Sequence, residues 1–357
     1  MSEYRRSSIH IPKSTRRRRI YDLLRHIPTF TIRFLRLLLF VVFLLPAFIV
    51  FLWHYVTCDR IAAYYGNATT QCRRNEEDDG SSCNDPFFSR HYLDIYGSKT
   101  TSCMQQSSSS DNKKPVVIFV TGGAWIIGFR MWGTLLARAL VPFGILVIIP
   151  DYRNFPRVNI DGMVQDVDMS IEWAFDNVQK YGGDSKKIVL VGQSAGAHIG
   201  GVIVAMKVLD WLRKERREIE SKSGIDMQNE KEVEMMPMLK STYTPQQLCG
   251  FISTSSPTNL VTMRPVFHHH GLSASVQRSI FGGVNDDQNS TTENSGNNGD
   301  DVFKVWSPYH LVMKSQEMFV PLLEMKDGNS KDLELKRIFP KLCVIHGTQD
   351  KTVSSTP

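Results

Sequence analysis

The chain has 357 residues, of which 42% are hydrophobic, so it can bury the core of one large domain with appendages and is not intrinsically disordered. Its formal net charge is +6 at pH 7, but arginine and lysine are concentrated in residues 1–36. Without that segment the rest of the chain is slightly acidic, which argues against a basic face for nucleic acid. We therefore predict no nucleic-acid partner.

A long apolar run, LLLFVVFLLPAFIVFLWHYV, occupies residues 37–56 directly after the basic segment 1–36. About 20 apolar residues in a helix match the thickness of the hydrocarbon core of a bilayer. Trp53 and Tyr55 lie at the far end of the run, where aromatic side chains favour the membrane interface. We predict a single transmembrane anchor here rather than a cleaved signal peptide, whose apolar region is shorter. The basic residues before it predict a cytoplasmic N-terminal segment.

Residues 57–88 are predicted to form a cysteine-containing stem on the far side of the membrane. Disulfides in an oxidising lumen would brace this stem, with the pairing left open, and the candidate cysteines are Cys58, Cys72, Cys83 and Cys103. Glycosylation sequons begin at Asn67 and Asn289. Together with the charge bias, these features predict a glycoprotein with a luminal or extracellular catalytic domain.

Residues 89–357 alternate short apolar runs with amphipathic stretches, such as 161–181 and 195–213, that are long enough for helices. This alternation predicts a mostly parallel, doubly wound α/β sheet. Two segments break the rhythm: a charged stretch at 215–244, interpreted as a lid or cap helix, and a polar insertion at 285–301. The predicted strands are 116–120, 145–149, 187–191, 248–253 and 341–345.

The sequence Gly192-Gln193-Ser194-Ala195-Gly196 has the form G-x-S-x-G and lies between a predicted strand and a predicted helix. Glycines at both ends permit a tight strand-to-helix turn that exposes the serine hydroxyl at the carboxyl edge of the sheet. This context predicts that Ser194 is a catalytic nucleophile.

A second glycine-rich turn, Thr121-Gly122-Gly123-Ala124-Trp125, follows the strand at 116–120. Glycines there allow backbone N–H groups to approach the oxyanion of a tetrahedral intermediate without side-chain obstruction. Gly122, Gly123 and Ala195 are therefore the predicted oxyanion hole. Many esterases have histidine where this chain has Thr121.

Asp350 follows the last predicted strand, at the place expected for the carboxylate of a Ser–Asp–His triad. No histidine follows it before Pro357, so the catalytic histidine is not present in this chain. The pattern favours a packing role for His198 and a solvated loop for His268–His270, whereas His346 ends the strand before the acid. We therefore expect the C-terminal end of the domain to be truncated, with the base beyond Pro357.

The segments FVTGGAWIIGFRMWGTLLARAL, DYRNFP, GGDSKKIVLVGQSAGAH and HGTQDKTV together resemble the isoprenylcysteine α-carbonyl methylesterases, membrane-bound relatives of the carboxylesterases. Threonine precedes the two glycines in that family, as Thr121 does here. The resemblance implies an α/β-hydrolase fold with Ser194 as nucleophile, Asp350 as acid, and Gly122, Gly123 and Ala195 around the oxyanion.

The reaction implied by the resemblance is hydrolysis of the methyl ester of a C-terminal prenylcysteine through an acyl-enzyme, with no metal or cofactor. The resemblance favours the endoplasmic reticulum or Golgi. Prenylated proteins face the cytosol, so either the topology prediction fails or the substrate is a small prenylcysteine methyl ester or another lipid-like ester. Two alternatives stay open: a membrane-bound carboxylesterase of other specificity, and a non-catalytic binding protein that lacks the triad histidine.

Overall fold

A computed structural model of the chain describes residues 42–43, 45–66, 90–98, 113–223, 239–282, 298–325 and 338–347. The chain divides into two units, Met1–Thr57 and Cys58–Pro357. In the first unit the described residues include an apolar helix, Leu45–Thr57, in which the Thr57 hydroxyl donates to the carbonyl of Trp53 (2.7 Å). Both predicted sequons, at Asn67 and Asn289, lie outside the described residues.

Within the described ranges, one helix is long and apolar enough to cross a membrane, Ala195–Glu218. However, 83% of its apolar window is buried inside the second unit, as expected for the core helix of a globular domain. The shorter helix Leu45–Thr57 covers only part of the predicted anchor at 37–56. The transmembrane anchor therefore stays a prediction.

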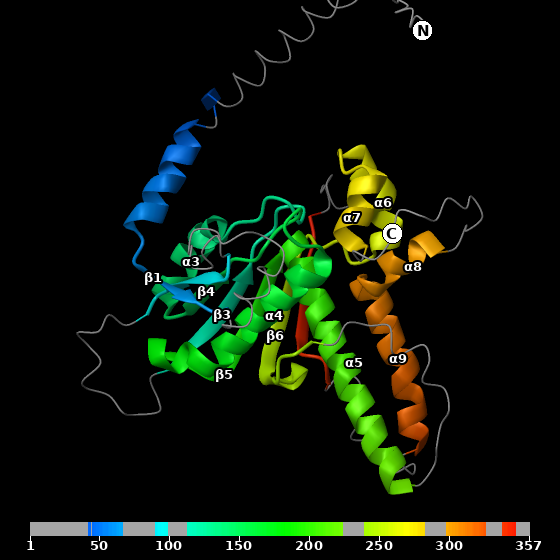
Figure 1. Cartoon of the computed structure of the whole chain (residues 1–357). Helices are drawn as coiled ribbons and strands as arrows, with labels where there is room; N and C mark the ends of the chain where they lie inside the picture. Colours follow the sequence, from blue (N-terminus) through cyan, green and yellow to red (C-terminus); the bar gives the residue numbers. More distant parts are fainter. Residues whose placement is uncertain are drawn as a thin grey trace, which may run out of the picture. The chain divides into compact units, whose positions relative to one another are not determined.

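A seven-stranded sheet in the order β1-β2-β4-β3-β5-β6-β7 forms the centre of the second unit (Figure 1). Strand β2 is antiparallel to both β1 and β4, and all other neighbours are parallel, which confirms the predicted mostly parallel sheet. The strands are β1 (Arg60–Tyr64), β2 (Tyr92–Tyr96), β3 (Lys114–Val120), β4 (Leu146–Pro150), β5 (Gly183–Gln193), β6 (Leu248–Thr254) and β7 (Lys341–Ile345).

Helices cover both faces of the sheet, and the alternation of side chains along β4 shows how. Leu146 and Ile148 join the cluster that includes residues of α4 (Ile160–Asn177) and α5 (Ala195–Ser223). Val147 and Ile149 point to the other face, where they pack with Ala137 of α3 (Thr134–Leu140). A strand buried on both faces needs a continuous apolar run, and β4 could be predicted from the sequence for this reason.

The remaining helices follow β6, and Figure 1 shows α9 alongside α5. They are α6 (Leu260–His269), α7 (Ala274–Phe281), α8 (Asn298–Val305) and α9 (Pro308–Met325). Short 3₁₀ helices flank the larger elements at η3 (Arg130–Gly133), η4 (Val141–Phe143), η5 (Val178–Tyr181) and η6 (Pro245–Gln247).

Several predicted boundaries differ from the structure. Residues 60–64, predicted as stem, form β1 of the sheet, and β2 was not predicted at all. Residues 215–223 continue α5 rather than starting an insertion, and Asn298 begins α8 inside the predicted polar insertion. Cys58 has a free thiol in the structure, whereas the other predicted stem cysteines lie outside the described residues.

A buried polar cluster ties the segment before β6 to α4 and α5. Asp168 of α4 accepts hydrogen bonds from the hydroxyls of Tyr243 (2.8 Å) and Ser241 (2.7 Å). Lys207 of α5 donates to the Ser241 carbonyl (2.6 Å), and its Nζ lies 4.2 Å from the centroid of the Tyr243 ring. Burial raises the pKa of the Asp168 carboxyl, and the positive charge of Lys207 opposes that shift.

Replacing Asp168 with alanine is expected to lower the free energy of unfolding by about 3 kcal/mol, because the hydroxyls of Ser241 and Tyr243 would lose their acceptor and buried Lys207 would lose a nearby negative charge. Guanidinium unfolding of the full chain in detergent, followed by circular dichroism, measures this change. Asp176→Ala, at an exposed position of the same helix, is the matched control and should change stability by less than about 0.5 kcal/mol. Equal stability of the two variants would contradict the predicted role of the cluster.

Candidate active site

The predicted nucleophile lies in a strained turn between β5 and α5. Ser194 has a φ of 52°, in the left-handed region that non-glycine residues rarely adopt. Its N–H donates to the carbonyl of Thr254 (2.8 Å), and its carbonyl accepts from the N–H of His198 (2.9 Å). These two bonds hold the backbone on both sides of Ser194, whose side chain is partly exposed.

Two glycines make this turn sterically possible. A Cβ atom on Gly192 would lie 2.4 Å from the Cα of Ala197, and a Cβ on Gly196 would lie 2.3 Å from the carbonyl oxygen of Val120. Both distances are far below van der Waals contact, and the nearest atoms belong to the backbone, which cannot move aside without disturbing the turn. The G-x-S-x-G pattern is therefore a packing requirement in this structure.

The glycine turn after β3 packs directly against the serine turn. A Cβ on Gly122 would lie 2.9 Å from the carbonyl oxygen of Gln193 and 3.1 Å from the Cβ of Ser194. The two turns meet because β3 and β5 are parallel neighbours, so their carboxyl ends share one edge of the sheet. The structure thus brings together Gly122 and Ser194, as the sequence predicted.

The loop that begins at Gly122 has an unusual backbone. Gly123 has a φ of 134°, and Ala124 and Trp125 follow at 49° and 63°. The carbonyl of Gly123 accepts the N–H groups of Ile126 and Ile127, each at 2.9 Å, which closes the loop on itself. In the part of the chain that the structure describes, the N–H groups of Gly123 and Ala195 do not donate a hydrogen bond to any backbone acceptor.

The DYRNFP motif at residues 151–156 forms hydrogen bonds to this loop. The hydroxyl of Tyr152 donates to the carbonyl of Thr121 (2.9 Å), and the side-chain amide of Asn154 donates to the carbonyl of Gly128 (2.8 Å). The N–H of Phe155 donates to the carbonyl of Trp125 (2.9 Å). Three carbonyls along the loop are therefore held by consecutive parts of one motif.

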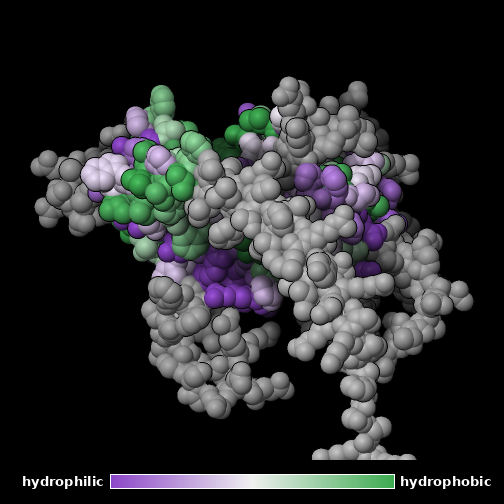
Figure 2. All heavy atoms as spheres, turned by 90° about the horizontal axis from the view of Figure 1, so that it is seen from above, coloured by the Kyte–Doolittle hydropathy of each residue, from purple (hydrophilic) through white to green (hydrophobic). Residues whose placement is uncertain are grey.

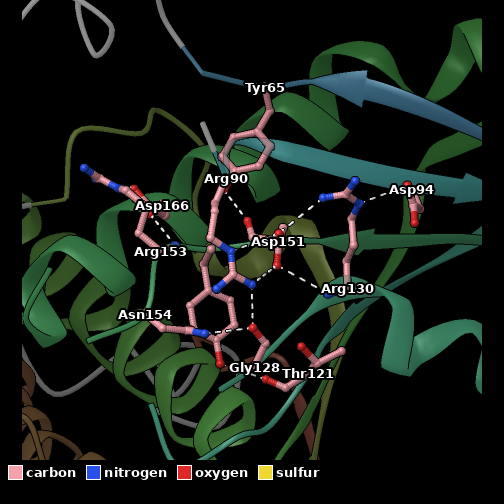
Figure 3. A network of polar contacts seen from close by, with 11 residues as sticks. Tyr65, Arg90, Asp94, Thr121, Gly128, Arg130, Asp151, Arg153, Asn154 and Asp166 are labelled. Atoms are coloured by element: carbon pink, nitrogen blue, oxygen red, sulfur yellow. Dashed lines mark hydrogen bonds and ion pairs between the residues drawn. The ribbon is translucent and has the colours of Figure 1, made fainter. Parts of the chain in front are cut away.

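A network of buried charges extends this support to the edge of the sheet (Figure 3). Arg90 binds the Asp151 carboxylate (Nε to Oδ2, 3.1 Å) and also donates to the carbonyl of Gly128. Arg130 binds Asp151 (3.2 Å) from the other side and Asp94 (3.1 Å) as well. Burial raises the pKa of the Asp151 carboxyl, while the hydrogen bonds from Arg90 act in the opposite direction.

A second ionic group lies beside this network and involves Arg153 of the DYRNFP motif. The Arg153 side chain binds Asp166 through two hydrogen bonds (2.6 and 2.9 Å), and His91 Nε2 lies 3.0 Å from Asp166 Oδ1. Burial alone would raise the pKa of Asp166, but hydrogen bonds from His91 and Arg153 outweigh it and hold that pKa below its usual value. Arg153 is thus paired with the buried carboxylate of Asp166.

His198 lies under the serine turn, fully buried, with both ring nitrogens engaged. Its Nδ1 accepts from the indole N–H of Trp125 (3.4 Å), so its Nε2 carries the proton that it donates to the carbonyl of Trp306 (2.7 Å). Burial lowers the pKa of His198 to about 4. A neutral imidazole without a free nitrogen is a packing residue, as the sequence indicated, and is not available as a general base.

The other predicted participants are placed as follows. Asp350 lies outside the described residues, although β7, which leads towards it, pairs in parallel with β6. His268 and His269 form the exposed end of α6, so the prediction of a loop there was wrong. Sequence reasoning missed Arg90, which has no local motif to mark it.

These features define the class of protein: an α/β-hydrolase-like fold with a serine at the turn between a central parallel strand and its helix. Residues 104–320 match the BD-FAE protein family, which is more than half of the chain, and the chain belongs to this family.

Curated relatives confirm the resemblance to the isoprenylcysteine methylesterases. A "Probable isoprenylcysteine alpha-carbonyl methylesterase" of Oryza sativa subsp. japonica is 34% identical over 240 residues, covering 67% of this chain and 44% of the relative. An "Isoprenylcysteine alpha-carbonyl methylesterase" of Arabidopsis thaliana is 36% identical over 168 residues, covering 47% of this chain and 34% of the relative. The chain therefore spans less than half the length of either relative.

The state of His198 predicts a specific dependence of stability on pH. Its pKa is about 4 in the folded state and near 6.5 when unfolded, so the unfolded chain alone takes up this proton between those values. The stability that the neutral, buried His198 contributes is fully present above pH 6.5, and it is lost as the pH falls through about 4. When the pH is lowered from about 7.5 to about 4.5, protonation of His198 in the unfolded chain should lower the free energy of unfolding by about 2–3 kcal/mol.

Urea unfolding of the wild-type chain and of His198→Gln at both pH values isolates this effect, because all other titrating groups are shared. The variant should lose less stability than the wild type on acidification, by about 2–3 kcal/mol. An identical pH dependence in both proteins would show that His198 does not titrate as the structure indicates.

Proposed function

We propose that this protein is a carboxylic ester hydrolase in which Ser194 is the nucleophile. The observation that carries the proposal is the contact between the two turns, where Gly122 lies against Ser194 and Ser194 itself has a φ of 52°. Strain of this kind persists only where the surrounding structure enforces it, and it is concentrated at functional sites.

The N–H groups of Gly123 and Ala195, with the turn at Gly122, supply the oxyanion hole in this proposal. Ala195 is the first residue of α5, so its N–H lies at the positive end of the helix dipole, where developing negative charge is stabilised. The strained loop that carries Gly123 is held by Tyr152, Asn154 and Arg90, so that its donors need not reorganise during the reaction.

The chemistry proceeds by acyl transfer. The Ser194 hydroxyl attacks the ester carbonyl, the alcohol leaves with a proton, and water then hydrolyses the acyl-enzyme to the free acid. Asp350 is the proposed acid of the triad. The base is a histidine other than His198, whose nitrogens are both occupied.

The proposed substrate is the carboxyl methyl ester of a prenylated cysteine, in a protein or as a small molecule. Support comes from the names of the relatives in rice and Arabidopsis and from the apolar segment at 37–56, because a prenyl chain partitions into a bilayer. We further propose that this segment anchors the enzyme with its catalytic domain in the lumen of the endoplasmic reticulum or Golgi, where the sequons at Asn67 and Asn289 would be glycosylated. No cofactor is required.

The natural full-length protein, purified in detergent, should release methanol from N-acetyl-farnesylcysteine methyl ester, and Ser194→Ala should abolish this release. Gly122→Ala should lower kcat about a hundredfold with little change in KM, because its Cβ would displace the oxyanion loop from Ser194. Lys187→Ala, an exposed position on the same strand as the serine turn, is the control and should keep full activity.

The alternatives give different outcomes in the same assay. Faster turnover of a short p-nitrophenyl ester, without competition from the prenyl compound, would assign the chain to carboxylesterases of other specificity. If the wild type and Ser194→Ala are equally inactive towards both esters while both bind them, the chain is a binding protein and the proposal fails.

A further inference from the structure

The short segment from η3 to η4 has an apolar face that no described element covers. The exposed positions 135, 138, 139, 142 and 143 follow helical spacing, so they lie on one side of α3 and η4. Leu135 is 49% exposed, Phe143 is 80% exposed, and Trp132 of η3 adds a ring that is 45% exposed. We call this the outer apolar surface, formed by Trp132, Leu135, Ala139, Pro142 and Phe143.

The opposite face of the same segment is apolar as well. Leu136, Ala137 and Leu140 belong to the cluster that packs against the sheet. A helix with apolar residues on both of its faces is normally covered on both, whereas this one has only its inner side covered within the described part of the chain. Figure 2 shows the surface from above, where hydrophobic residues in green and hydrophilic residues in purple gather in different areas.

The apolar helix Leu45–Thr57 is followed directly by the first residue of the second unit. Thr57 ends that helix, and the next residue, Cys58, packs against the same cluster as α3. Burial raises the pKa of the Cys58 thiol, and the positive charge of Arg138 on α3 opposes that shift. The predicted anchor at 37–56 therefore ends two residues before a residue that packs with α3.

The charges on this segment also fit a lipid surface. Residues 129–147 contain Arg130 and Arg138 and no aspartate or glutamate. Arg130 is bound to Asp94 and Asp151, and Arg138 lies at an exposed position of α3. Exposed aromatic and aliphatic side chains beside arginine, with no acidic residue, are the composition of helices that lie in the interface of a bilayer.

From these observations we propose that the outer apolar surface docks on the lipid bilayer and turns the oxyanion loop towards it. The loop leads directly into η3, and its own Ile127 is 63% exposed. A lipid-like ester would then reach Ser194 from the membrane without crossing water. This inference rests on the membrane anchor proposed for residues 37–56.

Quenching of tryptophan fluorescence by brominated lipids tests the docking on the full chain. The chain is reconstituted in vesicles of phosphatidylcholine with a minority of phosphatidylserine, with and without bromine on the acyl chains. Of its six tryptophans, Trp53 lies in the apolar helix and Trp132 on the proposed surface. Trp132→Phe should remove roughly half of the bromine-quenched signal, because two residues would share it.

Trp173→Phe is the matched control, because Trp173 packs with the cluster on the other face of the sheet, and it should leave the quenched signal unchanged. The double variant Leu135→Gln/Phe143→Gln keeps Trp132 but should lose its quenching, while Trp53 stays quenched and the melting temperature is retained.

The inference is overturned if Trp132→Phe and the wild type show equal quenching in vesicles that the chain has entered. That result, together with cross-linked dimers, would assign the surface to a second copy of the chain. If the wild type does not float with vesicles at all, both the anchor and the docking are wrong. Quenching of Trp132 in a chain that hydrolyses no ester would uphold the docking and reject the proposed activity.

Discussion

Close contact between two backbone turns at the carboxyl edge of the sheet is the constraint on which the site depends. One turn follows β3 and the other follows β5, and their separation leaves no room for a side chain at Gly122, Gly192 or Gly196. This contact places Ser194 in a left-handed conformation and holds the N–H of Gly123 in a loop that is folded against it. A single extra methyl group at these positions must therefore move either the serine or the oxyanion loop.

Such a loop needs more support than its own hydrogen bonds provide. Left-handed conformations at Ala124 and Trp125 cost of the order of 1–3 kcal/mol each, and they persist only when neighbouring groups enforce them. Enforcement comes from donors that converge on loop carbonyls, with Arg90 and Asn154 sharing the carbonyl of Gly128. Asp151 lowers the electrostatic cost of this arrangement, because its carboxylate neutralises the positive charges of the largely buried Arg90 and Arg130 side chains.

The parts of the sheet and of the site that a local residue pattern marks could be predicted from the sequence. The five predicted strands, β3 to β7, are rich in apolar residues, and the two glycine turns occur directly after two of them. Strands β1 and β2 were missed because RIAAY and YLDIY are short, mixed in polarity and antiparallel, so nothing in them suggests a strand that is buried on both faces. Arg90 was missed for another reason: its partner Asp151 lies 61 residues further along the chain, and only the folded sheet brings them together.

His198 shows how the loop is coupled to the helices above the sheet. Its ring links Trp125 of the oxyanion loop to the carbonyl of Trp306, which lies between α8 and α9. Trp125 also makes edge contacts with Phe267 of α6 (5.5 Å between ring centroids) and Phe281 of α7 (5.1 Å). Because one indole contacts the loop, the nucleophile helix and two of these helices, a shift of α6 or α7 must either move Trp125 or open a cavity beside it. The conformation of the oxyanion loop is therefore set jointly by the sheet below and by the aromatic cluster above.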